Sequence, residues 1–190
     1  MVIGYCFTGS FCTLAKSLVQ AEKLAQQGHT IIPIFSYNVR DLDTRFFRAS
    51  EFREKVREIT KEKIVDSIVS AEPLGPSIKC DVMVVAPCTS NTLSKLRHGI
   101  TDTPVTMAVK AHLRGERPVV IALCSNDGLG ASSEIIGEMR NRKHYYFTPV
   151  YQDDIINKPR SLVSDMDYLI PTIECAVKGV QFQPIIANKN

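Results

Sequence analysis

The chain has 190 residues, of which 44% are hydrophobic and 23% charged, and its formal net charge is +3. A chain of this length can bury a core without disulfide or metal staples, and its small net charge gives no reason to expect a nucleic-acid partner. No apolar run approaches the ~20 residues of a membrane helix, and the segment MVIGYCFTGS lacks the basic region and cleavage site of a signal peptide. We therefore expect one domain over residues 1–190 of a cytoplasmic protein with no membrane partner.

The first half of the chain predicts a unit of strand, helix and strand. Residues 2–7 form the first predicted strand, and Gly28 is typical of the position after a helix. The helix between them has one apolar stripe, formed by Leu14, Leu18, Ala21 and Ala25. A second strand at 30–35 completes a unit whose two strands are parallel. Further along, residues 50–63 predict a charged helix with a solvent-facing side, and residues 66–71 predict a short third strand.

The second half continues the alternation of strands and helices. The next strand, at 81–86, is almost entirely apolar, as is usual in the middle of a parallel sheet. Later strands are predicted at 118–123 and 144–147, and helices at 89–98, 103–114 and 134–141. No element is predicted between residues 148 and 159. The alternation indicates an α/β fold, a doubly wound parallel sheet of the Rossmann or flavodoxin type.

The six cysteines predict no metal site. None belongs to a C-x-x-C pair, and no histidine lies at a matching spacing. Most of them lie in or beside apolar runs, where free cysteine behaves as a small hydrophobic residue. We therefore expect free thiols.

Polar residues follow the predicted strands, where doubly wound sheets bind their ligands. Thr8, Gly9 and Ser10 come after the first strand, and Ser36 comes after the second. The hydroxyls, the glycine and the start of a helix suit a phosphate monoester, whereas no G-x-G-x-x-G or P-loop motif is present. The alternative is a tight turn in which Ser10 only caps the helix.

The segment PCTSNT, residues 87–92, has more polar side chains than the start of a helix requires. One capping side chain is enough, yet the run is Cys88, Thr89, Ser90, Asn91 and Thr92. A fourth strand exit, CSND at 124–127, adds Ser125 and Asn126. Together these exits favour a phosphorylated, aromatic cofactor.

The segment APCTSNTLSKLRHGITDTPVT, residues 86–106, resembles the Pro-Ala-Ser-Ala-Asn-Thr region of the FMN-binding flavoproteins. This family includes cysteine-type decarboxylases, phosphopantothenoylcysteine decarboxylases and flavin prenyltransferases. The residues that carry the resemblance are Ala86, Pro87, Asn91, Thr92, Lys95, Leu96, His98, Gly99, Ile100 and Asp102. The resemblance implies FMN as the cofactor, and assembly of the chain into homo-oligomers, trimers or larger.

The resemblance also implies which residues hold the flavin. Those near the phosphate and ribityl chain would be Thr8, Gly9, Ser10 and Ser36. Those near the ring would be Cys88, Thr89 and Asn91, with Asn126 as the residue shared with the family's Pro-Ala-Met-Asn loop. His98, late in its helix, is expected to support the fold.

Two departures from the family pattern argue against a cysteine decarboxylase. The decarboxylating members use a histidine after the third strand, whereas residues 30–97 contain none. Their Pro-Ala-Met-Asn loop corresponds to Leu-Cys-Ser-Asn at 123–126. The sequence therefore identifies no catalytic residue.

A narrower resemblance to one member of the family covers residues 1 to about 170. It rests on SYNVRDLDTRF, AEPLGP, ITDTPVTMAVKA, SNDGLG and SLVSDMD. It implies one subunit of a two-subunit oxidoreductase that aromatises a small cyclic dicarboxylate in a spore-forming bacterium. The partner subunit would have a nicotinamide fold and would supply NADP. Clamps for the dicarboxylate are expected among Arg97, Lys110, Arg114 and the loop of Asn126.

Two other functions stay open at this point. One is a flavin-dependent decarboxylase or flavin prenyltransferase that acts alone. The other is a non-catalytic scaffold for a nicotinamide-dependent partner.

Overall fold

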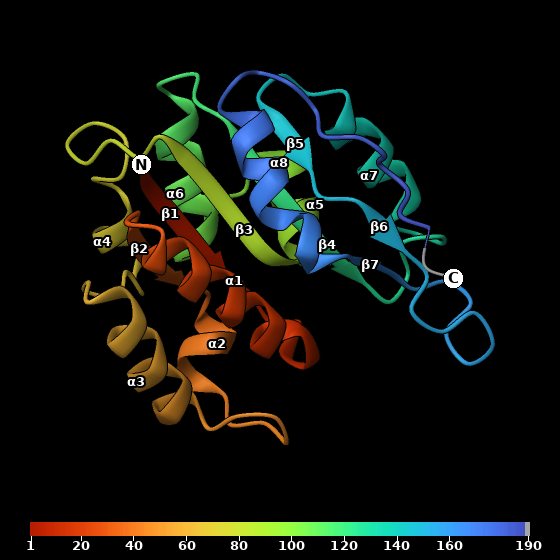
Figure 1. Ribbon diagram of the computed structural model, residues 1–190, viewed down its shortest axis with the longest axis horizontal. Helices are drawn as coiled ribbons and strands as arrows, with labels where there is room; N and C mark the ends of the chain where they lie inside the picture. The colour runs from red at the N-terminus through yellow and green to blue at the C-terminus, as the bar shows by residue number, and fades with distance from the viewer. Residues whose placement is uncertain (189–190) are drawn as a thin grey trace.

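The computed structural model describes residues 1–188 and has a seven-stranded mixed sheet at its centre (Figure 1). Five strands are parallel and lie in the order β2-β1-β3-β4-β5, the flavodoxin-like order. They are β1 (Val2–Phe7), β2 (Thr30–Phe35), β3 (Val82–Thr89), β4 (Val119–Ser125) and β5 (Tyr145–Phe147). The short strands β6 (Val150–Tyr151) and β7 (Leu162–Ser164) are antiparallel additions, and β7 pairs with the carboxyl end of β4. The predicted fold class is confirmed.

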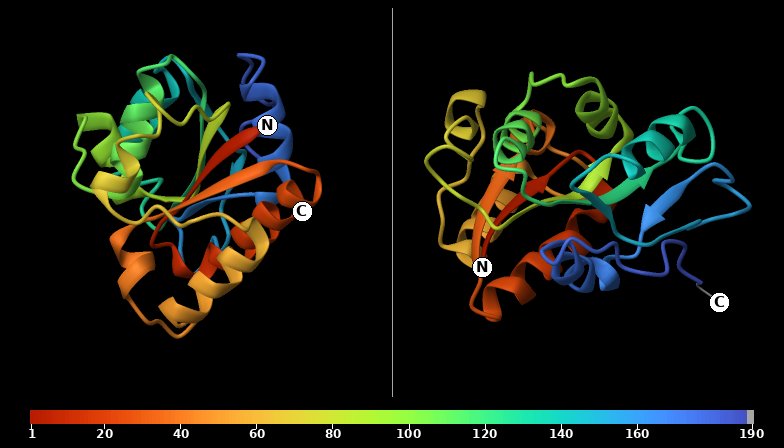
Figure 2. Two further views of the ribbon diagram at one scale, coloured as in Figure 1. Left: turned by 90° about the vertical axis from the view of Figure 1, so that its left-hand side faces the viewer. Right: turned by 90° about the horizontal axis from the view of Figure 1, so that it is seen from above.

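Helices cover both faces of the sheet, as the two views in Figure 2 show. One face packs against α1 (Leu14–Gln26), α2 (Tyr37–Asp41), α3 (Ala49–Thr60) and α8 (Leu169–Ala176). The other packs against α4 (Ile68–Ala71), α5 (Ser90–His98), α6 (Pro104–Leu113) and α7 (Ser133–Arg140). Two short 3-10 helices, η1 (Phe11–Thr13) and η2 (Met166–Tyr168), precede α1 and α8. None of the helices in residues 1–188 is long and apolar enough to cross a membrane.

The alternation of side chains along each strand separates the core into two layers. In β1, Tyr5 and Phe7 face the layer of α1 and α3, whereas Cys6 between them faces the layer of α6. Phe7 packs edge-on against Phe35 and Phe52, with ring centroids 5.7 and 5.4 Å away. This aromatic cluster attaches α3 to the sheet below the end of β1.

The regular pairing of β3 with β4 is interrupted just before the carboxyl edge. Val85 pairs with Ile121, but the next pair is Cys88 with Leu123, so the register shifts between Val85 and Cys88. The peptide bond between Ala86 and Pro87 in this bulge is cis. Because a bulge changes which face later side chains meet, Cys88 lies in the same core layer as Val85.

Several predicted elements need correction. Residues 66–71 contain the helix α4, whose Ser67 and Ser70 form a capping box; only Val65 forms a bridge to β2. Strand 144–147 is followed by two more strands, one of them inside the segment for which no element was predicted. The sheet is mixed because β6 and β7 run antiparallel to their neighbours. The other predicted helices and strands are present, with ends that differ by a few residues.

Candidate functional site

A cleft of about 570 Å³ is lined by residues at the carboxyl ends of β1, β3 and β4. Figure 1 shows these strands and the helices α1 and α5 that follow β1 and β3 at this edge of the sheet. In a sheet of this strand order the cleft lies between the parallel strands β1 and β3, where the order of the strands reverses, which is the usual ligand position. Its lining comprises Gly9, Ser10, Phe11, Cys12, Arg45, Phe46, Thr89, Ser90, Asn91, Cys124, Ser125, Asn126, Asp153, Lys158, Ser161 and Val163.

The structure brings together Gly9, Ser10, Thr89, Asn91 and Asn126, which were expected to contact a cofactor. The other three expected residues do not line the cleft, for reasons that the local structure explains.

Thr8 lies beneath the cleft and connects β1 to the bulge of β3. Its side chain is 1% exposed, and its hydroxyl donates to the Pro87 carbonyl at 2.7 Å. The same oxygen accepts from the Thr89 amide at 3.1 Å. Thr8 therefore positions the bulged end of β3 instead of facing a ligand.

Ser36 and Cys88 are also occupied elsewhere. The Ser36 hydroxyl accepts from the Val39 amide and caps α2. Cys88 is fully buried in the core layer of α5 and α6, where desolvation raises the pKa of its thiol well above the usual range. A thiol in that environment stays neutral and does not reach the cleft.

The turn after β1 offers an anion site. Ser10 starts the 3-10 helix, but its side chain makes no capping hydrogen bond; it lies 3.2 Å from the Thr13 hydroxyl. Ser10 therefore occupies the N-cap position of η1, but its hydroxyl does not cap the helix. A Cβ added at Gly9 would come no closer than 3.5 Å to a neighbouring atom, the Asn38 amide nitrogen. The fold therefore has room for a side chain at Gly9. Because glycine has none, a ligand can approach the backbone closely at this position.

The start of α5 supplies polar groups of two kinds. Thr89 is the N-cap, and its hydroxyl accepts from the Thr92 amide at 3.2 Å. Asn91 is exposed on the cleft side, and within residues 1–188 its carboxamide has no hydrogen-bond partner. Asn126, at the end of β4, is in the same situation. Two free carboxamides can pair with the mixed donors and acceptors of a heterocycle.

A network of serines around Asp127 forms one wall of the cleft. The carboxylate oxygen Oδ1 accepts from Ser125 at 2.8 Å, Ser132 at 2.8 Å and Ser90 at 3.0 Å. Hydrogen bonds from Ser125, Ser132 and Ser90 hold the pKa of Asp127 below its usual range. Ser90 and Ser125 line the cleft, whereas Ser132 does not. The predicted strand exits PCTSNT and CSND contain Ser90, Ser125 and Asp127, but not Ser132, and they did not predict the hydrogen bonds that join these residues.

Two loops bring cations to the mouth of the cleft. The Arg45 guanidinium lies 4.8 Å from the centroid of the Phe46 ring, and the Lys158 ammonium lies 2.8 Å from Asp153. Sequence reasoning missed both cations, because residues 42–48 and 152–161 have no periodic pattern.

The expected dicarboxylate clamps are mostly elsewhere. Arg97 pairs with Glu138 on α7, and neither Lys110 on α6 nor Arg114 at the C-cap of that helix lines the cleft. His98 is in the last turn of α5, at the opposite end of this helix from the cleft, with Nδ1 2.8 Å from the Ser94 carbonyl.

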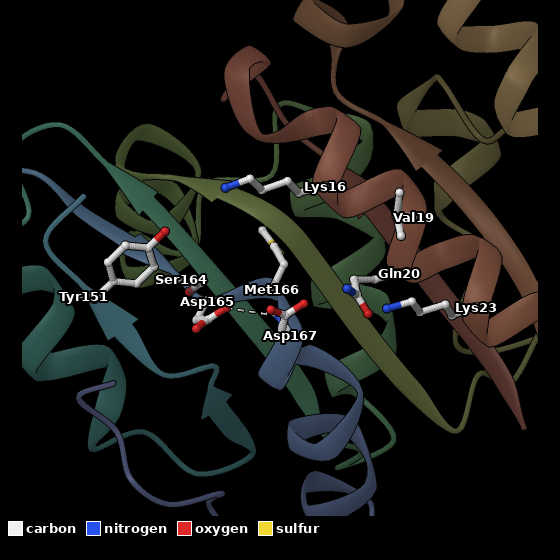
Figure 3. Close-up of a pocket in the computed structure, with 9 residues that line it drawn as sticks. All are labelled: Lys16, Val19, Gln20, Lys23, Tyr151, Ser164, Asp165, Met166 and Asp167. Carbon is white, nitrogen blue, oxygen red and sulfur yellow. Dashed lines mark hydrogen bonds between the residues drawn. The ribbon is translucent and has the colours of Figure 1, made fainter. Parts of the chain in front are cut away.

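A smaller pocket of about 240 Å³ lies on the face covered by α1 (Figure 3). Lys16 and Lys23 reach over it from α1, opposite Asp165 and Asp167 around η2, whose mutual hydrogen bond Figure 3 marks. It contains none of the expected site residues, and its strand residues belong to the antiparallel strands β6 and β7. The cleft at the sheet edge is therefore the better candidate for a cofactor.

Comparison with known proteins agrees with the geometry. The family model described as "Flavoprotein" matches residues 1–173. The chain belongs to the flavoprotein family. Over 184 residues it is 42% identical to the B subunit of dipicolinate synthase from Bacillus subtilis (strain 168), covering 97% of this chain and 92% of that protein.

Solved structures of flavoproteins have the same fold. The crystal structure of the dipicolinate synthase B subunit from Bacillus halodurans C superimposes with a TM-score of 0.91 at 42% identity, covering 100% of this chain and 97% of that one. Burkholderia xenovorans DmrB, solved in complex with FMN and described as a cubic protein cage for redox transfer, gives a TM-score of 0.67 at 18% identity. That alignment covers 91% of this chain and 93% of DmrB, and it shows the fold alone. The narrower resemblance, to the B subunit of dipicolinate synthase, is confirmed as a likeness along nearly the whole chain.

Proposed function

We propose that this flavoprotein is the FMN-binding B subunit of a dipicolinate synthase. Together with an A subunit it would convert a hydroxytetrahydrodipicolinate intermediate, which also loses water, or a dihydrodipicolinate intermediate to dipicolinate by a two-electron oxidation. The reaction would take place in the mother-cell cytoplasm of a sporulating bacterium. The likeness to two B subunits over nearly the full chain supports this proposal. The observation that carries it is the convergence of Gly9, Ser10 and Asn91 on one cleft at the sheet edge.

The residues of the cleft fit FMN. The Gly9–Ser10 turn and the amides at the start of η1 would receive the terminal phosphate, because helix starts leave N–H groups unpaired. The free carboxamides of Asn91 and Asn126 would pair with the edge of the flavin ring. The flavin would supply a two-electron acceptor for the oxidation, with NADP on the partner subunit as a second acceptor.

This chain would also orient the substrate. Arg45 and Lys158 provide positive charge at the mouth of the cleft, where a dicarboxylate would enter. None of the histidines in the described residues lines the cleft, and the carboxyl group of Asp127 is already held by three hydroxyls. The chain therefore has few groups for proton transfer, which is why we propose that turnover requires the A subunit.

The two alternative functions make different demands. A decarboxylase or flavin prenyltransferase acting alone would need its own acid–base group beside the flavin, and the absence of a cleft histidine in residues 1–188 disfavours it. A non-catalytic scaffold would not need the carboxamides of Asn91 and Asn126 to be free of hydrogen bonds at the strand exits.

Assays of each subunit alone and of the mixture test the proposal. We expect dipicolinate only from the mixture. Asn91→Leu replaces the carboxamide by an apolar side chain of similar volume, and it should lower the rate of the mixture by about tenfold or more. Asn141→Leu, on the far end of α7, is the control and should leave the rate unchanged. Full turnover by this chain alone would favour an independent enzyme, and indifference of the mixture to Asn91→Leu would favour the scaffold.

A further inference from the structure

The hydroxyl of Ser90 has a restricted orientation. Its single proton has two acceptors within reach on the protein side, Ser125 Oγ at 2.5 Å and Asp127 Oδ1 at 3.0 Å. Ser125 directs its own proton to Asp127 at 2.8 Å and accepts from the Asp127 amide at 3.2 Å. Because Asp127 is ionised and accepts from every neighbouring hydroxyl, the proton of Ser90 points into the network.

The side of Ser90 that faces the cleft is therefore an acceptor. A serine hydroxyl has one donor and two lone pairs, and the donor is already used. A carboxylate on a ligand cannot pair with lone pairs, and the charge of Asp127 behind them repels it. A ligand N–H or O–H is the matching group at this wall of the cleft.

Both cleft hydroxyls of the network occupy positions where the family motifs have none. Ser90 corresponds to the second alanine of Pro-Ala-Ser-Ala-Asn-Thr, and Ser125 to the methionine of Pro-Ala-Met-Asn. Flavin binding by relatives with those motifs does not need the two hydroxyls. This difference favours the substrate, and not the flavin, as the molecule that meets Ser90.

We propose that Ser90, oriented by Ser125 and Asp127, determines specificity by accepting a hydrogen bond from a ring N–H or ring hydroxyl of the cyclic substrate. The inference rests on the proposed function. The aromatic product, a pyridine dicarboxylate, has lost these donors and presents only a nitrogen lone pair, so Ser90 does not hold it. The contact thus distinguishes the substrate from the product, and Ser125 and Asp127 are positioning residues.

The test uses the mixed enzyme with bound FMN. We expect Ser90→Ala to raise KM for the cyclic intermediate by about three- to tenfold, the effect of one hydrogen bond. Inhibition by dipicolinate and the Kd for FMN should stay within about twofold, because neither uses the contact. Ser90→Thr should restore KM, since it keeps the hydroxyl.

A second variant tests the orientation. Asp127→Asn provides an amide donor that allows the Ser90 proton to turn towards the cleft, so KM should rise as in Ser90→Ala. The double variant Ser90→Ala/Asp127→Asn should have a KM no higher than that of either single variant, because all three remove the same contact. The control is Ser133→Ala, an exposed hydroxyl that bonds only the Gly130 carbonyl, and KM should not change.

The outcomes separate the inference from the function on which it rests. An active mixture in which Ser90→Ala behaves like Ser133→Ala overturns the inference alone. Equal weakening of substrate and product overturns it too, and so does a loss of FMN affinity at constant KM, which would assign the donor to the cofactor. A wild-type mixture that makes no dipicolinate refutes the proposed function and, with it, the identity of the substrate.

Discussion

Neighbouring side chains from Cys88 to Thr92 have separate partners. Cys88 packs in the core, Thr89 caps α5 and bonds Thr92, and Ser90 joins the Asp127 network. Asn91 presents to the cleft a carboxamide that has no hydrogen-bond partner within residues 1–188. The polar run identified the segment correctly as part of a strand exit. The division of roles depends on the bulge at Ala86–Pro87. The alternation of side chains along a regular strand does not predict where a bulge will shift it.

At Ser10, a negative charge should empty the flavin site. Ser10→Asp places a carboxylate beside the start of η1, where we propose the phosphate of FMN, and the two anions would repel each other. We expect FMN affinity, measured by fluorescence titration, to fall by about 100-fold or more. Ser10→Ala, which removes the hydroxyl without adding charge, should lose no more than about tenfold. Undiminished FMN binding by Ser10→Asp would contradict the placement of the phosphate.

At Gly9, a single methyl group should lower the affinity for FMN without lowering the stability of the fold. The atom nearest to a Cβ at this position is 3.5 Å away, an ordinary contact, so Gly9→Ala should leave the Tm within a few degrees. The methyl would occupy the space next to the proposed phosphate and lower FMN affinity. Thermal unfolding with and without FMN separates the two effects. A large loss of Tm in the ligand-free protein would show that the fold itself requires glycine.

At the scale of elements, the sequence predicts the long strands and helices better than the short strands and the loops. The regular apolar strands and amphipathic helices were predictable because burial imposes a period on them. The antiparallel strands β6 and β7 contain only two and three residues, too few for a period. The loops that carry Arg45 and Lys158 come together only in the folded chain, so their place at the cleft could not be predicted.

The Thr8 contacts should be important for stability. Thr8→Val keeps the shape but leaves the Pro87 carbonyl and the Thr89 amide unpaired in the interior. We expect the free energy of unfolding to fall by about 2 kcal/mol, and FMN affinity to fall as Thr89 moves. Thr172→Val is the control, since that buried hydroxyl only bonds the Tyr168 carbonyl one turn earlier. Equal losses in urea unfolding of the two variants would deny Thr8 a special role.

At the scale of the whole molecule, acid should weaken the folded state partly through Asp127. Its pKa is below the usual 3.8 because the serine hydroxyls stabilise the carboxylate. The stabilisation is fully present above the unfolded pKa and is lost as the pH falls through the folded pKa. Urea unfolding at about pH 7 and about pH 3 should therefore show a smaller loss for Asp127→Asn than for the wild type. Equal losses would mean that the network does not favour the ionised form.

The family resemblance implies a homo-oligomer, a trimer or larger, and two exposed isoleucines indicate a surface for contact between copies. Ile155 and Ile156, 67% and 84% exposed, are adjacent on the loop that brings Asp153 and Lys158 to the cleft. Two neighbouring isoleucines in water are costly, and burying them against another copy would also fix this loop beside the proposed flavin site. We expect light scattering at micromolar concentration to give a multiple of the 21.2 kDa chain mass. The double variant Ile155→Ser/Ile156→Ser should lower that mass and weaken FMN binding together. Val69→Ser is the matched control, because Val69 is 83% exposed on α4, which contributes no residue to the cleft. A monomeric wild type that still binds FMN would refute the expectation of a homo-oligomer. Dissociation by Val69→Ser alone would refute the placement of the interface at Ile155 and Ile156.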